Sequence, residues 1–263
     1  MGRLVRVGAL RELFTQPLYR TLKRSSDFSG ELLFDTPSAH IDGLMSNERN
    51  VAFVPPIDFA QNSSGMILYP GIGVASSGES SVARLYLRRN LPLIRTLAVG
   101  NVSTTDVVLS RIVLGEKYDS EPAIIPVIGS IDEMLAKADC ALVSGDSLLT
   151  VNSNHPFIDI VDEWNDITEL PFVHTICIAR SEIFSKNISA LLLASQEAGR
   201  NSLESIAQET SAEAKLPADL LQNYLSHFFY GFDDLSKTSL DEFFRMAFYY
   251  GMLPDIPEIN FAE

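Results

Sequence analysis

GIGVASSGESSVARLYLRRNLPLIRTLAVGNVSTTDVVLSRIVLGEK, residues 71–117, is the stretch that decides the fold of this chain. A Gly- and Ser-rich turn opens it, and the run Leu85-Tyr86-Leu87 then has the apolar and aromatic composition typical of a β-strand. A second short apolar run, Leu97-Ala98-Val99, ends at Gly100. Apolar residues at helical spacing follow residue 106. The stretch therefore predicts two strands and then a helix.

The predicted helix begins with three hydroxyl side chains, Ser103, Thr104 and Thr105, and is a candidate anion site. The first backbone N–H groups of a helix have no partner inside it, and the helix dipole favours negative charge there. The alternative is that one hydroxyl simply caps the helix, which is the commoner role of an isolated Ser/Thr cluster. The sequence leaves both interpretations open.

Composition restricts the classes of partner. The chain has 263 residues and a formal net charge of −14, which argues against nucleic acid or an anionic membrane as partner. A small anion held by a few local donors remains compatible with this charge.

Cys140 and Cys177 lie in apolar runs without metal-ligand spacing, so we expect buried, reduced thiols and no metal site. The N-terminal MGRLVRVGAL has no long apolar run, and we expect a cytoplasmic protein.

Strands and helices alternate on both sides of the central stretch. This pattern predicts parallel sheets covered by helices, with ligands at the carboxyl ends of the strands. Ser130 with Glu133 forms a capping-box pattern, and residues 181–250 are helical by periodicity. The other predicted elements are strands at 4–10, 31–34, 51–54, 123–127, 140–143 and 172–179, and helices at 13–22 and 39–46.

Two long extended segments, near residues 69–88 and 171–180, join the two α/β halves. Two crossings predict a bilobal α/β protein with a discontinuous first domain, residues 1–82 plus 175–263, and a second domain, residues 83–174. The predicted ligand cleft lies between these domains, as in binding proteins.

Several segments, in a fixed order and spacing, carry a resemblance to a known family. They are Val5-Arg6-Val7-Gly8 with Pro17-Leu18, Thr36-Pro37-Ser38, Val51-Ala52-Phe53-Val54-Pro55, Gly73-Val74-Ala75-Ser76, Ser81-Val82, Ser103 with Thr105, Leu142-Val143-Ser144-Gly145-Asp146, Glu163-Trp164 with Leu170-Pro171-Phe172-Val173, and Gly251-Met252-Leu253-Pro254. The chain resembles the chorismate dehydratase family of the futalosine route to menaquinone. That family has a type 2 periplasmic-binding-protein-like fold without an export signal.

The resemblance implies a lyase that removes water from chorismate to give 3-[(1-carboxyvinyl)oxy]benzoate, without a metal or organic cofactor. It implies that Ser81 and Thr105 hold the substrate. Ser38, Gly145 and Asp146 would lie around the rim, with Asp146 either orienting neighbouring donors or capping the next turn. Such a reaction depends mainly on positioning two carboxylates and a proton transfer.

Three positions depart from the family pattern. Phe14 stands where the family has an active-site asparagine, and a benzyl group makes no hydrogen bond of the kind an amide makes. Asp106 replaces a serine, and its carboxylate would repel a carboxylate ligand at close range. Pro56 replaces another common serine.

Three further residues are candidates for compensating these changes. Arg11 follows the first strand, where a guanidinium would grip a carboxylate or simply face solvent. Arg84 interrupts a strand that should be buried, and would pair with an acid across the lobes or reach into the cleft. His174 interrupts an apolar strand and is either a satisfied core histidine or a proton-handling group.

Two functional hypotheses follow. The first is a chorismate dehydratase-like lyase in which Ser81, Asp146 and His174 act catalytically. The second is a non-catalytic, binding-protein-like paralogue that holds a small anionic or aromatic metabolite, which Phe14 favours. The partner we expect is a small anionic, chorismate-like substrate, and a homodimer is compatible with both hypotheses.

Overall fold

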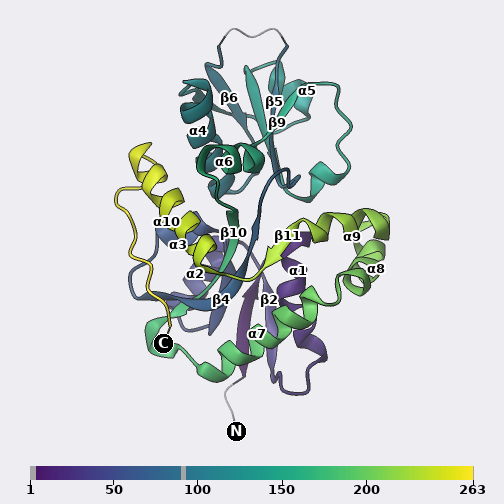
Figure 1. Cartoon of the computed structure of the whole chain (residues 1–263), viewed down its shortest axis with the longest axis vertical. Coiled ribbons are helices and arrows are strands. Elements are labelled where there is room, and N and C mark those ends of the chain that lie inside the picture. Colours follow the sequence, from purple (N-terminus) through teal and green to yellow (C-terminus); the bar gives the residue numbers. More distant parts are fainter. Residues whose placement is uncertain (1–3, 90–92, 263) are drawn as a thin grey trace. The chain divides into compact units, whose positions relative to one another are not determined.

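The computed structural model describes residues 4–89 and 93–262, which fall into two compact units (Figure 1). The chain passes between the units four times, after Ser76, Phe172, Asp241 and Ile256. The predicted division had two crossings and kept all of residues 175–263 in the first domain. Unit 1 comprises Met1–Ser76, Val173–Asp241 and Pro257–Glu263, and unit 2 comprises Ser77–Phe172 and Glu242–Ile256.

Unit 1 is built on a six-stranded sheet of order β11-β4-β10-β3-β1-β2. Strand β1 runs parallel to β2 and β3, as the alternating pattern predicted, whereas β10 is antiparallel to β3 and β11 to β4. The sheet is therefore mixed rather than mainly parallel. Its strands are β1 (Val5–Ala9), β2 (Gly30–Phe34), β3 (Val51–Val54), β4 (Met66–Ser76), β10 (Phe172–Arg180) and β11 (Phe228–Tyr230).

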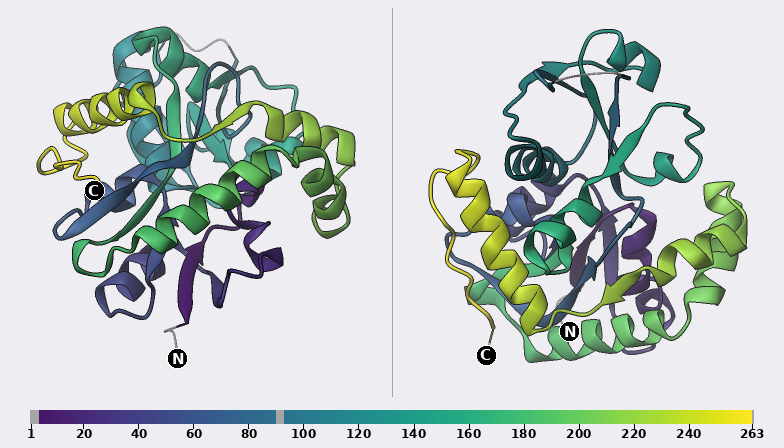
Figure 2. Two further views of the ribbon diagram at one scale, coloured as in Figure 1. Left: turned by 60° about the horizontal axis from the view of Figure 1, so that its bottom comes forward. Right: turned by 45° about the horizontal axis from the view of Figure 1, so that its top comes forward.

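The helix predicted over 13–22 is instead three short pieces, η1 (Leu13–Thr15), α1 (Gln16–Tyr19) and η2 (Leu22–Arg24). Thr15 donates its hydroxyl to the carbonyl of Glu12 at 2.7 Å, and Pro17 has no N–H to give, so the local bonds of a long helix are not completed. Helix α7 (Lys186–Arg200) packs against α1 (Figure 2). The other helices of this part of the chain are α2 (Pro37–Met45), α3 (Pro56–Ala60), α8 (Leu203–Ala214), α9 (Ala218–Ser226) and α10 (Asp234–Tyr249).

Strand β11 is an element that the helical periodicity of residues 181–250 did not predict. Phe228 and Tyr230 are buried and Phe229 is exposed, which is the two-residue alternation of a strand with one covered face. Three residues are too few for this alternation to stand out in a sequence between two long helices. Pairing with β4 creates the strand.

Unit 2 is built on a five-stranded sheet of order β7-β6-β8-β5-β9. Strand β6 runs parallel to β7 and β8, and β5 runs antiparallel to β8 and β9, so this sheet is mixed as well. The strands are β5 (Ala83–Leu87), β6 (Thr96–Val99), β7 (Ala123–Pro126), β8 (Cys140–Ser144) and β9 (Phe157–Asp159). The helices are α4 (Thr104–Tyr118), α5 (Ile131–Leu135), α6 (Ile160–Thr168) and the 3₁₀ turn η3 (Asp146–Leu149).

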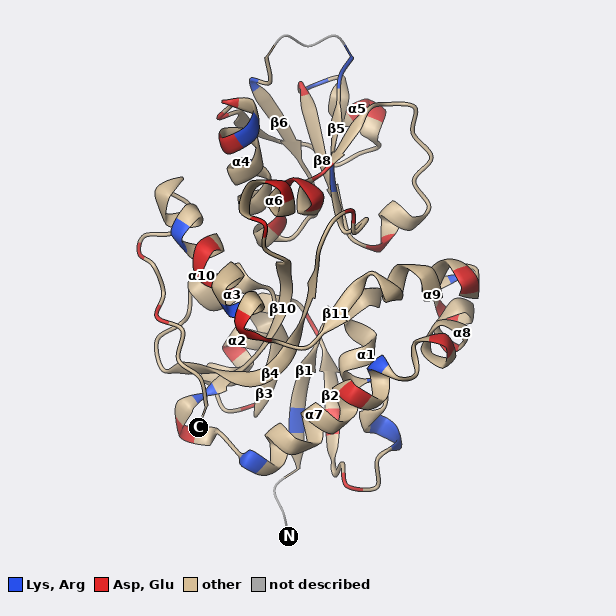
Figure 3. Ribbon diagram, viewed as in Figure 1, with Lys and Arg blue, Asp and Glu red and all other residues tan. Residues whose placement is uncertain are grey.

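Local signals read from the sequence are confirmed at several of these elements. The Ser130–Glu133 capping box begins α5, and the Thr36 hydroxyl accepts the Ala39 N–H at the start of α2. Both cysteines are free and buried. Acidic side chains are spread over exposed helices, including α6 and α8 (Figure 3), in keeping with the net charge of −14. Among the described residues, no helix has both the length and the apolar character needed to cross a bilayer.

Three aromatic rings in the core of unit 2 explain why residues after Asp241 belong to it. Trp164 of α6, Phe172 and Phe243 of α10 are each 0–1% exposed, and their ring centroids lie 5.3 to 5.9 Å apart in edge-to-face contacts. Edge-to-face pairs place positive ring edges on negative ring faces, so they add to the stabilisation from burial. Phe243 thus joins α10 to the core of unit 2.

Candidate functional site

Loops that are distant in sequence meet at one edge of the unit 2 sheet. Because β5 is antiparallel to β8, with Ala83 opposite Ser144, the segment before β5 lies beside the segment after β8. The Gly145 N–H donates to the carbonyl of Val82 at 2.8 Å across this junction. Strands β6 and β8 are parallel, so the start of α4 follows β6 at the same edge. We call this the sheet-edge site; it comprises Ser81, Arg84, Ser103–Thr105, Gly145, Asp146 and Asp159.

Ser81 has an unusual backbone conformation at this edge. Its φ of 57° lies in the left-handed region, which costs a non-glycine residue about 1 kcal/mol. The Ser81 N–H donates to Oδ2 of Asp159 at 2.9 Å, and its Oγ accepts a hydrogen bond from the Arg84 guanidinium at 2.9 Å. These bonds hold a conformation that the isolated residue disfavours.

Arg84 pairs with acids, but the acids belong to its own unit rather than to the opposite lobe as one alternative had predicted. Its guanidinium donates to Glu79 at 2.7 Å and lies 4.0 Å from Oδ2 of Asp159. It also stacks over the Phe157 ring, 4.2 Å from the centroid. The side chain is only 14% exposed, so this charge is held firmly in place.

Asp159 was not among the predicted site residues. Its carboxylate accepts N–H groups from Ser81, Val161 and Asp162, and the last two are the free donors at the start of α6. Burial raises the pKa of the Asp159 carboxyl to about 6, because loss of solvent penalises the charged form more than the N–H donors favour it. An acid just before a helix is a common cap, but the bond of Asp159 to Ser81 is visible only in the fold.

The hydroxyl cluster at α4 caps the helix, as the commoner interpretation held. Ser103 accepts the Thr105 N–H at 3.2 Å. Thr104 is exposed, whereas Thr105 and Asp106 are buried in the first turn. Asp106 therefore lies on the buried side of the first turn of α4.

Gly145 and Asp146 form the turn that ends β8. Gly145 has φ of 85°, a conformation that L side chains rarely adopt, and Asp146 is the first residue of η3. Asp146 therefore stands at the start of a turn, and its role at the site stays a prediction. The sequence Ser-Gly-Asp is thus explained by the sharp exit from the strand.

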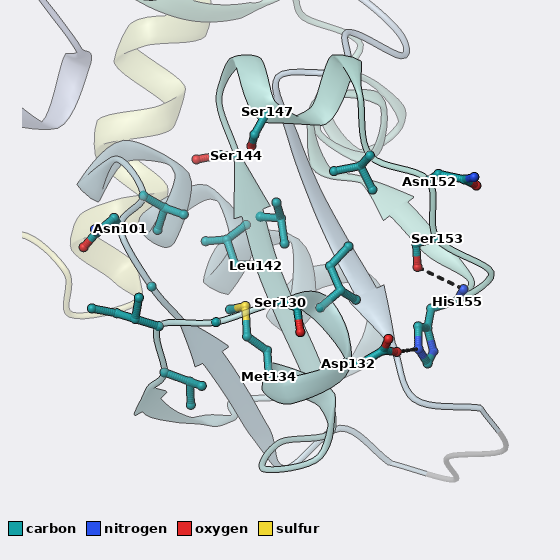
Figure 4. Close-up of a pocket in the computed structure, with 18 of the residues that line it drawn as sticks. Asn101, Ser130, Asp132, Met134, Leu142, Ser144, Ser147, Asn152, Ser153 and His155 are labelled. Carbon is teal, nitrogen blue, oxygen red and sulfur yellow. Dashed lines mark hydrogen bonds and ion pairs between the residues drawn. The ribbon is translucent and has the colours of Figure 1, made fainter.

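A pocket of about 770 Å³ adjoins the same edge within unit 2 (Figure 4). Apolar side chains such as Met134 and Leu142 line it together with Ser144, and Nε2 of His155 lies 2.7 Å from Oδ1 of Asp132 on its wall. None of its lining residues is Lys or Arg. The sequence analysis named none of its polar residues as site residues: Asn101, Ser130, Asp132, Ser144, Ser147, Asn152, Ser153, Asn154 and His155. They come from four separate segments of the chain, so no local pattern joins them.

In unit 1, the structure brings two predicted residues together. Phe14 is buried, and its ring lies 5.3 Å from that of His174 and 5.1 Å, stacked, from that of Phe228. His174 Nε2 lies 2.7 Å from Oγ of Ser76. Burial lowers the pKa of His174 to about 3, since the charged imidazolium is poorly solvated there. His174 is thus a hydrogen-bonded, neutral core histidine at neutral pH.

The remaining two predicted residues of unit 1 are exposed. The guanidinium carbon of Arg11 lies 5.4 Å from the centroid of the Phe34 ring. Ser38 is in the first turn of α2, with its hydroxyl 3.2 Å from that of Thr36. Neither lies with Phe14 and His174 in the aromatic cluster.

Comparison with known proteins gives the family. A family model described as menaquinone biosynthesis matches residues 5–249. The chain belongs to this family.

Solved structures with a similar fold are numerous. Protein AF1704 from Archaeoglobus fulgidus matches with a TM-score of 0.70 at 15% identity, over 95% of this chain and 98% of that one. The periplasmic aliphatic sulphonate binding protein SsuA from Escherichia coli matches with a TM-score of 0.67 at 12% identity, over 98% and 96%. An ABC transporter protein from Parabacteroides distasonis matches with a TM-score of 0.70 at 16% identity, over the whole of both chains. This menaquinone-family chain has the type 2 periplasmic-binding-protein-like fold.

Proposed function

We propose that this protein is a chorismate dehydratase-like lyase, which converts chorismate to 3-[(1-carboxyvinyl)oxy]benzoate and water. The observation that carries the proposal is the arrangement of Ser81, Arg84 and Asp159 at the sheet edge. Membership of the menaquinone biosynthesis family and a fold shared with small-molecule binding proteins support it.

The geometry suits an anionic oxygen. Because the Ser81 oxygen accepts from Arg84, its own hydroxyl hydrogen is directed to another acceptor, and a ligand carboxylate supplies one. The strained backbone of Ser81 lies beside the buried charge pair of Arg84 and Asp159, and such an arrangement is typical of sites that hold a ligand in one orientation.

The reaction itself needs little covalent help. The C–O bond of the ring hydroxyl breaks, the hydrogen on the neighbouring ring carbon leaves as a proton, and the two form water. The aromatic ring that results supplies the driving force. Ser81 and the Arg84 charge would hold a carboxylate and keep the ring oriented while the proton and the hydroxyl depart.

One observation favours a second candidate, a binding-protein-like paralogue without turnover. The position at which the resembled family has an asparagine is here Phe14, whose ring is packed against His174 and Phe228. An apolar ring in this cluster neither donates nor accepts the hydrogen bonds of an amide.

Incubation of the purified protein with chorismate, followed by chromatography for the carboxyvinyloxybenzoate, tests the proposal. We expect product from the wild-type protein and a loss of at least tenfold in kcat/KM for Ser81→Ala. Phe14→Leu serves as a control variant in the aromatic cluster of Phe14, His174 and Phe228, because leucine is apolar like phenylalanine. If wild type makes no product but binds chorismate by calorimetry, the binding-protein candidate replaces the lyase. If it neither binds nor converts chorismate, both candidates are rejected for this ligand.

A further inference from the structure

We propose that Asp159 is the positioning residue of the sheet-edge site: its carboxylate fixes the left-handed backbone of Ser81 and, together with Arg84, presents the Ser81 hydroxyl as a donor to an anionic ligand. The ligand part of this inference rests on the proposed function. The link between Asp159 and Ser81 does not.

The carboxylate joins two segments of the chain through its two oxygens. Oδ2 accepts the Ser81 N–H at 2.9 Å, while Oδ1 accepts the N–H groups of Val161 at 3.1 Å and Asp162 at 3.4 Å. The turn before β5 is thereby tied to the first turn of α6. That turn contains two left-handed residues, Gly78 with φ of 72° and Ser81 with φ of 57°. Only the second of these has a side chain, and it is the one that the carboxylate holds.

Both oxygens are required as acceptors, which makes the position selective for a carboxylate. An asparagine here has one carbonyl oxygen and one NH₂ group, and the NH₂ would face an N–H donor on one of the two sides. Either the cap of α6 or the bond to Ser81 would be lost. Asp159→Asn therefore separates the positioning role from side-chain volume.

Arg84 completes the arrangement from β5. Its contacts to Glu79, at 2.7 Å, and to the Phe157 ring, at 4.2 Å, fix the guanidinium that donates to the Ser81 oxygen at 2.9 Å. One lone pair of the Ser81 oxygen accepts this hydrogen bond, and the Ser81 backbone is held by Asp159. The Ser81 hydroxyl hydrogen therefore has a restricted range of directions. This is the geometry needed to donate to a ligand oxygen.

Because the carboxylate of Asp159 titrates, the way it holds Ser81 depends on pH and can be measured. The charged group that faces it is Arg84, which favours the ionised form and is itself paired with Glu79. Burial outweighs the favourable contacts, and the pKa of Asp159 is about 6. Protonation below this pH removes one acceptor and the countercharge of Arg84, so Ser81 is held less firmly.

The structural link is tested by NMR on protein labelled with ¹⁵N-serine, with Ser81→Ala used to identify the Ser81 amide signal. We expect this signal to move with a midpoint near pH 6 in the wild-type protein and in Asp162→Asn. Asp162 is an exposed acid on the same helical turn and is the matched control. The shift should vanish in Asp159→Asn. A Ser81 amide that does not titrate in the wild-type protein overturns the inference, whatever the variant does.

The ligand link is tested by calorimetry with chorismate. Affinity should fall about tenfold in the wild-type protein between pH 7 and pH 5, as a single group of pKa about 6 requires. Asp159→Asn should bind at least tenfold more weakly at pH 7 and show no such change with pH. Equal affinity in Asp159→Asn and wild type overturns the inference and leaves the proposed function standing. Failure of the wild-type protein to bind chorismate overturns the proposed function, and the amide titration still decides the link between Asp159 and Ser81.

Discussion

At the scale of single residues, the Phe14 cluster shows how one buried aromatic ring contributes to the core of unit 1. The Phe14 side chain is 6% exposed, and its ring packs against His174 and Phe228. It therefore contributes to stability whether or not a ligand is bound. Asparagine at this position would place an amide among aromatic rings. The stability of unit 1 therefore depends on this apolar side chain.

We predict that Phe14→Asn lowers the free energy of unfolding by about 3–5 kcal/mol, the range for loss of a buried aromatic ring, because the amide also finds few partners there. Phe14→Leu, which remains apolar, should cost about 1–2 kcal/mol. Urea denaturation of both variants measures the difference. Equal stability of the two variants would contradict the packing role.

His174 gives a pH-dependent prediction at the same scale. Its pKa is about 3 in the folded protein and near 6.5 when unfolded, so the unfolded state binds more protons between these values. The contribution of His174 to stability is present above about pH 6.5 and is lost as the pH falls toward 3, by up to about 1.4 kcal/mol per pH unit. Asp159, with its raised pKa, acts in the opposite direction.

Comparison with His174→Phe isolates this contribution, because the other titrating groups are common to both proteins. Urea midpoints at pH 7 and pH 4.5 should differ less in the variant than in the wild type. The loss of the Ser76 hydrogen bond shifts the variant equally at both pH values. If the pH slopes of the two proteins coincide, His174 is not buried in the neutral form.

At the scale of elements, the packing of α7 on α1 depends on a glycine. A Cβ built at Gly199 would lie 1.8 Å from the carbonyl oxygen of Pro17, a backbone atom that cannot move aside alone. Alanine would otherwise favour the helix by about 1 kcal/mol. The clash outweighs this gain, which is why a residue with low helix propensity stands within a 15-residue helix.

We therefore predict that Gly199→Ala lowers the free energy of unfolding by about 1–3 kcal/mol, the usual cost of overpacking. Glu197→Ala, an exposed position on the same helix, should leave it nearly unchanged. Urea denaturation followed by circular dichroism checks both. Stabilisation by Gly199→Ala would mean that helix propensity dominates and the close contact relaxes.

At the scale of the whole molecule, the four passages of the chain between the units make α10 part of both. Its first turns belong to unit 1, and from Glu242 onward it belongs to unit 2, where Phe243 packs on Trp164 and Phe172. Trp164 is the one tryptophan of the chain, so its fluorescence reports on the core of unit 2.

We predict that Phe243→Ala lowers the unfolding free energy measured by tryptophan fluorescence by about 3–5 kcal/mol. Its emission should move to longer wavelength at denaturant concentrations where the wild type is still folded. Phe248→Ala, 45% exposed on the same helix, is the control and should have little effect. An unchanged midpoint in Phe243→Ala would show that the core of unit 2 does not need α10.

Much of the fold could be predicted because its signals are local. Alternation of apolar runs gave most strands, and Ser130, Glu133 and Thr36 gave helix starts that the structure confirms. What could not be predicted depends on contacts between distant segments. Strand β11 exists through pairing with β4, and Asp159 meets Ser81 across 78 positions of sequence. The same holds for the pocket, whose polar residues come from four separate segments of the chain.

The candidate site shows the same limit in chemical terms. Arginine in a buried strand was recognisable as unusual, but its partners Glu79 and Asp159 were not, because strand register decides which acid it meets. His174 could likewise be recognised as unusual in an apolar strand. Only the structure shows that Ser76 is a hydrogen-bond partner of its ring.

The late position of Phe243 in the chain has a consequence for biosynthesis. A ribosome makes Trp164 and Phe172 some seventy residues before the segment Glu242–Ile256 that covers them. During that interval Trp164 and Phe172 have each other but not the ring of Phe243. The aromatic core of unit 2 is therefore completed only after α10 has been synthesised.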